Sequence, residues 1–449
     1  MKRPMPPPND MAVTREIVGN PQKMLIFMEA PETGPTARYL PWDAIRHRRP
    51  PEGLNHEEWW AAIKFSRRQM QREIALEDKV GKPFKFSLPD VVLRSLEEIN
   101  RDASGQISIS SQVTNPATRD RYLVSSLIEE SINSSQLEGA STTRRVAKEM
   151  IRSGRSPRDR SERMIFNNYQ AMRMVGERRD QPLTPELICD IHRVVTDGTL
   201  ENPDAAGRFQ LPGEERVGVY ADYDDNLLHT PPPAEVLPSR IERLCRFANG
   251  ELDSGYIPPI LRALTIHFMI GYDHPFEDGN GRTARILFYW SMLNQGYWLT
   301  EYVAISPILK SAPSKYVHSY LHTEDDDNDL TYFHIYQVSV LQQAIAKLHE
   351  YLARKAQEVK DLRKSISASQ ELFNHRQIAI LDYAMKNPGS SVTVQSHMTS
   401  HNVVYETARR DLLGLEQLAL LSKSKVSKSF VWTPVDDLSE RLRSLEVPS

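Results

Sequence analysis

The sequence predicts a mainly α-helical protein that carries one short β-hairpin and ends in a smaller domain. Three observations predict this class. Apolar residues recur at helical spacing through much of the chain, and one such stretch opens with Thr184 and Pro185, a typical helix start. A short β-rich stretch at 214–230 interrupts the helices. Beyond about residue 365 the spacing changes to three short helices and a hairpin.

The composition limits the class of protein. With 449 residues, 40% of them hydrophobic, and a net charge of −3, we expect a soluble globular protein of two or three domains without overall attraction to nucleic acid. The two cysteines, Cys189 and Cys245, fit a reducing compartment. The sequence has neither a recognisable signal peptide nor an apolar stretch of membrane-spanning length. We therefore expect a cytoplasmic location and no membrane partner.

The first domain is predicted at residues 1–110. Its proline-rich start, through Asn20, is expected to be flexible, and a mostly helical portion that continues through Ile74 follows. Trp59 and Trp60 are expected to pack in its core. We expect this domain to pack on the central one, residues 111–360.

The central domain opens with a predicted helix from Arg121 to Leu137, which Gly139 would cap. A hairpin is predicted at 214–230, because a β-rich run is followed by an acidic turn, an apolar pair and a series of prolines. Further along, the acidic run at 324–329 is expected to be a solvated loop before a helix.

The chemistry is concentrated in residues 274–285, HPFEDGNGRTAR. A predicted buried helix, Pro259 to Tyr272, leads into this stretch, and another helix follows it. Gly279 and Gly281 can bring bare backbone N–H groups close to an anion, and the positive end of the second helix adds to that attraction. The pattern indicates a site for phosphate groups.

Four side chains of the same stretch suit nucleotide chemistry. Arg282 and Arg285 lie three residues apart and project from one side of the helix. His274 can accept a proton near neutral pH. Asp278 offers the single carboxylate that suits Mg²⁺, since this ion takes its other ligands from phosphate and water. The sequence therefore predicts a reactive nucleotide site.

These twelve residues resemble the signature of the Fic family, HPFx(D/E)GNGRxxR, and match it at every defined position. The resemblance implies a Fic-type helical bundle that transfers AMP from ATP, with Mg²⁺, to a Ser, Thr or Tyr hydroxyl of a protein. It also implies a role for each signature residue: His274 as general base, Asp278 as magnesium ligand, the Gly279 and Gly281 backbone with the Asn280 side chain as anion hole, Arg282 and Arg285 on the β- and γ-phosphates, and Phe276 as an anchor in the core.

A second motif resembles a regulatory element of the family. Residues 134–139, SSQLEG, resemble the (S/T)xxxE(G/N) inhibitory motif, here on an inhibitory helix at 121–139, so Ser134, Glu138 and Gly139 are regulatory candidates. The resemblance implies that Glu138 pairs with Arg285 and takes the place of the γ-phosphate. Such a pair is chemically credible, because a closed fraction of about 99% requires only about 2.7 kcal/mol.

The hairpin at 214–230 resembles the Fic flap, whose edge strand pairs with the target protein. The resemblance implies that the run Val217, Gly218, Val219 and Tyr220 binds the target segment, and main-chain pairing of this kind makes little demand on target sequence.

The last domain, predicted at 365–435, resembles a winged helix. Residues 404–412 would form its recognition-type helix. Arg409, Arg410, Lys423, Lys425 and Lys428 make the region locally positive, whereas Glu406, Asp411 and Glu416 interrupt the positive patch. DNA binding and protein contact, including a homodimer, both stay open.

Three functions remain open from the sequence. The leading one is a protein adenylyltransferase (AMPylator) that Glu138 holds inactive. The second is a deAMPylase, in which Glu138 orients a water molecule. The third is a winged-helix DNA-binding regulator whose Fic module senses nucleotides. The target protein, self-modification and the preferred nucleotide base are not readable from the residues.

Overall fold

The computed structural model describes residues 3–29, 38–103, 116–153, 155–220, 227–368, 373–386, 390–401, 403–426 and 429–444. These form two compact units, Met1–His349 and Glu350–Ser449. Helices make up most of both, so the predicted mainly α class is confirmed. In the described part of the chain, no helix is both long and apolar enough to cross a membrane.

The N-terminal part of the larger unit packs around Trp59 and Trp60, which are almost fully buried as predicted. Two features differ from the prediction. A helix, α1, lies within the proline-rich start, and Ile74 belongs to a strand instead of a helix. The elements are α1 (Asp10–Ile17), α2 (Pro21–Met28), α3 (Trp42–Ile45), α4 (His56–Arg68), β1 (Arg72–Glu77), β2 (Pro83–Phe86) and α5 (Asp90–Ala103).

The antiparallel β1–β2 hairpin fastens this N-terminal part to the central helices. Ile74 and Leu76 alternate with more exposed residues, as in a strand with one buried face. On the paired strand, Phe84 is fully buried and packs edge-on against Phe268 and Tyr272. The alternation spans too few residues to separate a strand from a helix end by sequence alone.

The acidic run at 324–329 is not a solvated loop, so this prediction was wrong. Asp329 is fully buried and accepts a hydrogen bond from Tyr39, at 2.5 Å. Asp326 lies 2.8 Å from the ammonium group of Lys64, which is also buried. These carboxylates tie the N-terminal part to the start of α16 (Thr331–Ala368).

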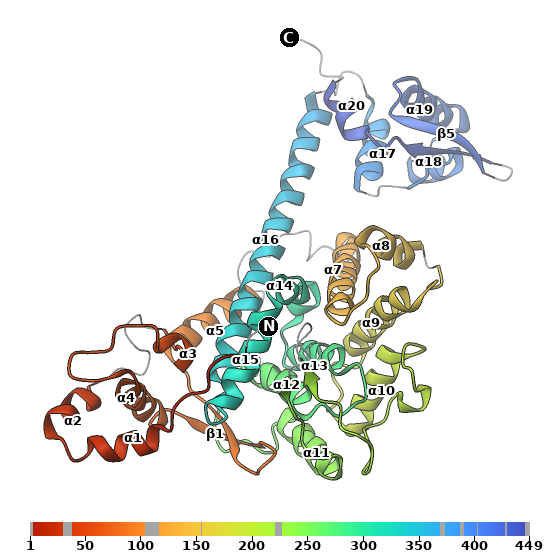
Figure 1. The fold of residues 1–449 in the computed structure, drawn as a ribbon. Coiled ribbons are helices and arrows are strands. Elements are labelled where there is room, and N and C mark those ends of the chain that lie inside the picture. The colour runs from red at the N-terminus through yellow and green to blue at the C-terminus, as the bar shows by residue number, and fades with distance from the viewer. Residues whose placement is uncertain are drawn as a thin grey trace. The chain divides into compact units, whose positions relative to one another are not determined.

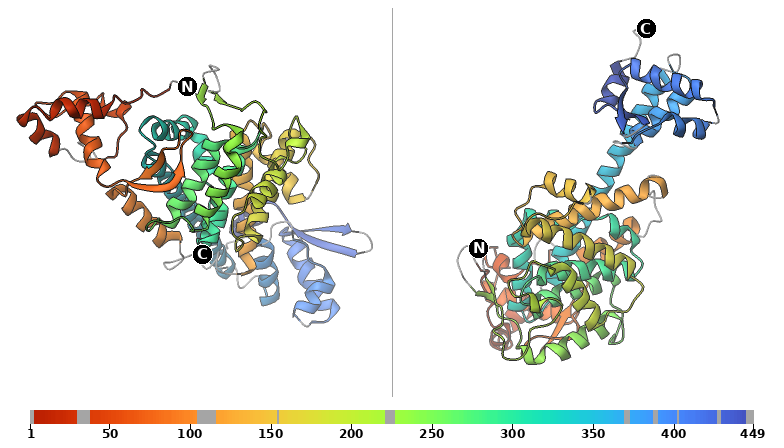
Figure 2. Two further views of the ribbon diagram at one scale, coloured as in Figure 1. Left: turned by 90° about the horizontal axis from the view of Figure 1, so that it is seen from below. Right: turned by 90° about the vertical axis from the view of Figure 1, so that its right-hand side faces the viewer.

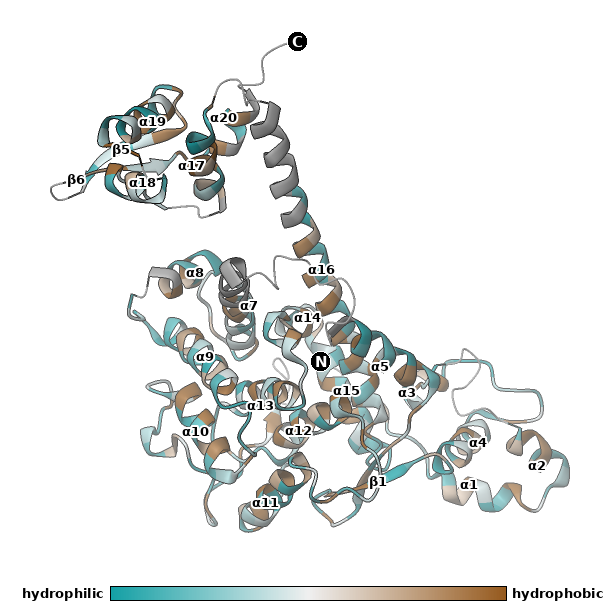
Figure 3. Ribbon diagram, turned by 180° about the vertical axis from the view of Figure 1, so that it is seen from behind, coloured by the Kyte–Doolittle hydropathy of each residue, from teal (hydrophilic) through white to brown (hydrophobic). Residues whose placement is uncertain are grey.

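The central helices surround α12 and α13, which lie side by side (Figures 1 and 2). Nearly every residue of both is buried, whereas α10 and α11 carry a hydrophobic and a hydrophilic face (Figure 3). The remaining elements are α7 (Pro116–Leu137), α8 (Arg144–Ser153), α9 (Arg160–Glu177), α10 (Pro185–Thr196), η1 (Pro203–Ala205), β3 (Val219–Tyr220), β4 (Leu227–His229), η2 (Ala234–Val236), α11 (Leu237–Ala248), α12 (Pro259–Asp273), α13 (Asn280–Asn294), η3 (Trp298–Tyr302), α14 (Ser306–Ser311) and α15 (Pro313–Asp325).

The smaller unit has three helices followed by a hairpin, in the predicted order. A bridge between Val392 and Trp432 adds a short extended segment to that hairpin. Leu381, Leu412 and Trp432 lie in its core, and the unpredicted α20 closes it. Its elements are α17 (His375–Lys386), α18 (Val394–His401), α19 (Tyr405–Gln417), β5 (Leu421–Val426), β6 (Ser429–Pro434) and α20 (Leu438–Ser444). The winged-helix assignment stays a prediction.

Candidate active site

His274 ends the buried helix α12 in a left-handed backbone conformation, with φ 45° and ψ 53°. Such a conformation costs a residue other than glycine about 1–3 kcal/mol, so the surroundings must hold it. The half-buried imidazole has its Nδ1 3.4 Å from the carbonyl oxygen of Gly271. A proton on Nδ1 leaves the lone pair of Nε2 free to accept another.

Burial lowers the pKa of His274 to about 4. The nearby His229 and Arg216 lower the pKa further, whereas the hydrogen bond to Gly271 and the charge of Glu138 raise it. The imidazole is therefore neutral at pH 7, which is the form that a general base requires.

The loop after His274 is closed by hydrogen bonds within it. The amide side chain of Asn280 accepts from the backbone nitrogen of Phe276, at 2.9 Å, and donates to the carbonyl of the same residue, at 2.8 Å. Asn280 is buried and both ends of its amide are engaged, so the structure does not place this side chain in the expected anion hole. Its amide instead holds the loop closed because the backbone groups of Phe276 need partners.

Gly279 permits the sharp turn into α13. Its φ is +84°, and a Cβ at this position would come within 2.8 Å of the Thr196 methyl group. Both the backbone conformation and the close approach therefore require glycine. The fully buried ring of Phe276 stacks on His192, with ring centroids 3.7 Å apart and planes 3° apart, in agreement with its expected anchoring role.

Arg282 has the unpaired donors that an anion would satisfy. Its side chain is fully buried, and one terminal nitrogen donates to the carbonyl of Val195, at 3.2 Å. Its Nε and other terminal nitrogen have no hydrogen-bond partner. Buried donors of this kind are normally paired, so a phosphate fits them well.

Asp278 is the exposed carboxylate beside these donors. One of its oxygens lies 3.5 Å from Arg282 and 3.6 Å from Arg160. No group of three or more His, Cys, Asp or Glu side chains that could hold a metal occurs among the described residues. Magnesium here would need the oxygens of a bound phosphate in addition to Asp278, which is how this ion usually binds.

The predicted inhibitory residues lie against Arg285, which is almost fully buried. Its Nε donates to the hydroxyl of Ser134, at 2.8 Å, and a terminal nitrogen donates to the Ser134 carbonyl, at 3.0 Å, and to the Glu138 carboxylate, at 2.8 Å. Gly139 then turns the chain with a φ of +90°. The structure thus brings together all three residues of this motif and the second signature arginine.

The Glu138 carboxylate also fills the space above Gly281. A Cβ at Gly281 would collide with a carboxylate oxygen of Glu138. An acidic side chain therefore occupies the site at the start of α13 where backbone N–H groups attract an anion.

The flap is a shorter hairpin than predicted. Val219–Tyr220 pairs with Leu227–His229, whereas Val217 and Gly218 precede the strand. Residues 221–226 of the predicted 214–230 flap lie outside the described residues. Val217, Tyr220 and Leu227 are exposed apolar side chains on this hairpin.

Sequence reasoning missed His192 and Arg160. The Nδ1 of His192 accepts from the backbone nitrogen of Gly207, at 3.0 Å, so its Nε2 donates to the carbonyl of Asp278, at 2.8 Å. The residue thereby connects α10 to the signature loop. The one sequence signal was a histidine beside the apolar face of a predicted helix. Nothing in the sequence points to Arg160.

Comparison with known proteins points to one family. Residues 182–292 match the Fic/DOC family model. Over 230 residues, half of this chain and 41% of the relative, the chain is 28% identical to Protein adenylyltransferase Fic of Drosophila persimilis. It is also 28% identical over 236 residues to the protein of that name from Drosophila melanogaster, covering 52% of this chain and 43% of the relative. The chain thus spans less than half the length of these relatives.

The fold also resembles that of a solved structure. The crystal structure of a Fic family protein from Desulfovibrio desulfuricans G20 covers 77% of this chain and 96% of its own, with a TM-score of 0.51 and 16% sequence identity. At this identity the likeness concerns the fold alone.

Proposed function

We propose that the chain, whose residues 182–292 match the Fic/DOC family model, is a protein adenylyltransferase that Glu138 holds inactive. The relatives' name supports AMP transfer from ATP for the matched half of the chain. The observation that carries the inhibition is the Glu138 carboxylate, which is bonded to Arg285 and lies over Gly281.

In the proposed reaction, His274 Nε2 takes the proton of a Ser, Thr or Tyr hydroxyl on the target protein. The hydroxyl oxygen forms a bond to the α-phosphorus of ATP, and the bond from that phosphorus to the bridging oxygen of the β-phosphate breaks, so pyrophosphate leaves. Arg282 offers the phosphates two buried donors that have no hydrogen-bond partner. Asp278 would hold Mg²⁺, whose charge would offset that of the phosphates. Most of the acceleration would come from position and charge.

The inhibition follows from competition for one space. A γ-phosphate that pairs with Arg285 needs the position that the Glu138 carboxylate occupies, and two anions cannot share it. Ser134 accepts from Nε of Arg285 and from the same terminal nitrogen that contacts Glu138, so Arg285 faces Glu138 in a fixed orientation. Gly139 allows the chain to leave the helix immediately after Glu138.

The target would bind at the flap. Val219 and Tyr220 form a short edge strand, and the apolar side chains of Val217, Tyr220 and Leu227 are exposed around it. A target segment added beside β3 would bring its hydroxyl toward His274 by main-chain pairing. The substrate class is therefore an extended protein segment with a hydroxyl, which includes segments of this protein itself.

The test uses the Glu138→Gly variant with a mixture of ATP, GTP, UTP and CTP, followed by mass spectrometry of the intact and digested protein. We expect an AMP adduct on a hydroxyl residue, and we expect His274→Ala in the same background to remove it. An adduct from another nucleotide would correct the donor. Persistent labelling in the double variant would show that His274 is not the base.

The deAMPylase alternative makes the opposite prediction for Glu138. A protein that carries the AMP adduct would be incubated with wild type and with the Glu138→Gly variant. Release of AMP by wild type and not by the variant would identify removal of AMP as the reaction.

One observation favours a second activity, DNA binding by the smaller unit. Of the three acidic residues that interrupt the basic sequence, Asp411 is buried, where it binds Arg376 and His397, and Glu416 accepts from the ring nitrogen of Trp432. The exposed side of α19 therefore keeps Arg409 and Arg410 with only Glu406 beside them.

We propose that this face contacts the phosphates of duplex DNA, with Lys423 and Lys425 of the β5–β6 hairpin. The test is fluorescence anisotropy of a labelled duplex with the full chain in a salt series. Replacing Arg409 and Arg410 by Gln should reduce the magnitude of the salt slope by about 2. Arg173→Gln, on α9, is the matched control, and an equal loss with this control would contradict the assignment.

A further inference from the structure

The turn that carries His274 is held by the flap segment, which we define as residues 208–220 and 227–232, the flap and the residues that flank it. Four consecutive carbonyls, those of residues 272–275, each accept a hydrogen bond from this segment. His229 Nε2 donates to the carbonyl of Tyr272, at 2.7 Å, and the backbone nitrogen of Gln210 donates to that of Pro275, at 2.9 Å. The two carbonyls between them accept from one nitrogen of Arg216, at 2.7 Å for Asp273 and 3.2 Å for His274.

Arg216 also joins the two ends of the flap. It precedes β3, and its Nε donates to the carbonyl of Pro232, which follows β4, at 2.8 Å. Its remaining terminal nitrogen donates to the side chain of Gln210. One planar guanidinium thus contacts the start of the flap, its end and the turn of His274.

The chemistry of this position suits an arginine. The last carbonyls of a helix have no partner within it, and α12 ends at this turn. A guanidinium at the carboxyl end of a helix also meets the negative end of the helix dipole. A lysine would keep the charge, but its single nitrogen cannot hold the flap and the turn in one fixed geometry.

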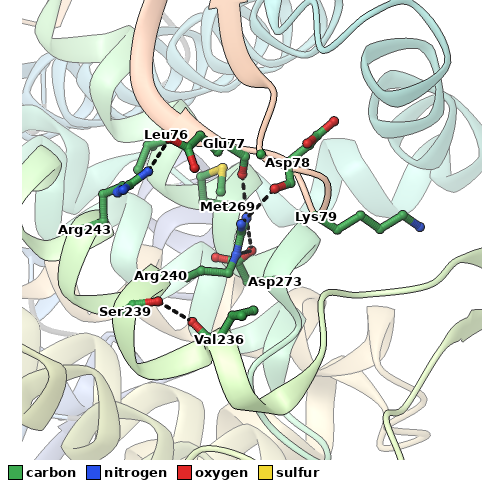
Figure 4. Close-up of a pocket in the computed structure, with 11 residues that line it drawn as sticks. Leu76, Glu77, Asp78, Lys79, Val236, Ser239, Arg240, Arg243, Met269 and Asp273 are labelled. Carbon is green, nitrogen blue, oxygen red and sulfur yellow. Dashed lines mark hydrogen bonds and ion pairs between the residues drawn. The ribbon is translucent and has the colours of Figure 1, made fainter.

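A different arginine holds the turn from the scaffold side. Arg240 of α11 binds the Asp273 carboxylate, at 2.7 Å, and donates to the carbonyls of Glu77 and Asp78 on the β1–β2 hairpin (Figure 4). These residues line a cavity of about 220 Å³. Because Arg240 binds no part of the flap in the described contacts, it fixes the turn without connecting it to the target site.

We propose that Arg216 is a positioning residue that couples the flap to His274. A target strand paired with β3 steadies the flap, and Arg216 passes this constraint to the turn, so that His274 Nε2 faces the target hydroxyl. The proposal rests on the proposed function, since it assigns a task to a residue of the same site. Arg216 touches neither target nor nucleotide in this role.

The kinetic test compares Arg216→Lys with its parent, the Glu138→Gly variant. Single-turnover labelling of the protein by ATP with radioactive α-phosphate measures the transfer, and calorimetric titration measures ATP binding. Displacement of a reacting group by about 1 Å can cost about 100-fold, so we expect at least about a tenfold slower transfer with an ATP Kd changed less than about twofold.

Arg208→Lys is the matched control. Arg208 lies in the same segment and binds Glu214 through both terminal nitrogens, yet none of its described hydrogen bonds reaches residues 272–275. We expect the control to transfer AMP like its parent. Transfer by Arg216→Lys at the parent rate, or an equal loss of transfer and of ATP affinity, would overturn the proposal.

A second measurement needs no turnover. Besides burial, Arg216 and His229 lower the pKa of His274, and Glu138, which the parent lacks, raises it. Arg216→Gln removes a positive charge, so the pKa of His274 should rise above its value in the parent. Arg216→Lys keeps the charge, so the pKa of His274 should stay below its value in Arg216→Gln. NMR titration of histidine-labelled full chain measures this, with the signal assigned by His274→Ala.

Failure of the proposed function and failure of the Arg216 inference give different results. A parent that shows no AMP adduct refutes the proposed function, and the NMR titration still tests whether Arg216 acts on His274. An unchanged His274 titration in Arg216→Gln refutes the inference even if the parent is active.

Discussion

Replacing Glu138 with glycine removes the carboxylate that holds Arg285 and leaves the space above Gly281 open. The hydrogen bond between them is 2.8 Å long, Arg285 is buried and the Glu138 side chain is 28% exposed. A hydrogen bond of this charged kind contributes about 1.5–3 kcal/mol. At about 1.4 kcal/mol for each factor of ten, its loss shifts the closed state toward the open one by roughly 10- to 150-fold.

The assay is the initial rate of AMP incorporation at saturating Mg·ATP, for wild type and variant. We expect an increase of about tenfold to a hundredfold. Glu129→Ala is the control, because Glu129 lies on the same helix but pairs with Arg144 and Lys148. An unchanged rate in Glu138→Gly, or an equal increase in the control, would refute the reasoning.

Thermal stability offers an independent check on this variant. Without ATP, Glu138→Gly should melt at a lower temperature than wild type, because Arg285 loses a carboxylate and keeps Ser134, Tyr316 and the more distant charge of Glu130. ATP should raise the free energy of unfolding of the variant more than that of wild type, by up to about 2.7 kcal/mol when ATP is present at 100 times its Kd. Differential scanning fluorimetry with and without nucleotide measures both changes.

Three further predictions concern the signature loop. Gly279→Ala should lower the free energy of unfolding in urea by about 1–3 kcal/mol more than Gly213→Ala, since both glycines have a positive φ but only the first would meet a neighbouring methyl group. The kcat/KM of the Glu138→Gly variant should fall on the acid side only at or below about 4, because burial lowers the pKa of His274 to about 4 in the presence of Glu138 and loss of the Glu138 charge lowers it further; a fall near 6.5 would contradict the burial. His192→Phe keeps the stacking on Phe276 but leaves two backbone groups unpaired, at about 1–3 kcal/mol each, and calorimetry should show weaker ATP binding with lower stability.

The sequence was most informative where local chemistry decides the structure. Helix starts such as Thr184–Pro185 follow from capping and from the fixed φ of proline, so α10 begins where expected. The glycine turn before α13 also follows from local requirements. The contact of Glu138 with Arg285 was expected only through the family resemblance, because the spacing of two residues 147 positions apart carries no such information.

Distant partners explain what the sequence could not predict. Asp329 reads as part of a solvated acidic run, but Tyr39, 290 positions away, supplies a hydroxyl that allows its burial. Asp411 reads as an interruption of a basic helix until Arg376 and His397 meet it inside the smaller unit. The left-handed turn at His274 is held by donors of the flap segment that bind its carbonyls, and no local pattern encodes these donors.

Glu130 limits how the inhibitory helix can respond to nucleotide. This buried carboxylate lies two turns before Glu138 on α7, and it accepts hydrogen bonds from the backbone nitrogen, at 2.9 Å, and the hydroxyl of Ser306. If this helix left the protein, both hydrogen bonds would break and the buried donors of Ser306 would lose their partner. Activation should therefore involve rotation of the Glu138 side chain and rearrangement of the turn at Gly139. Small-angle scattering profiles of the silent and active forms should then superimpose.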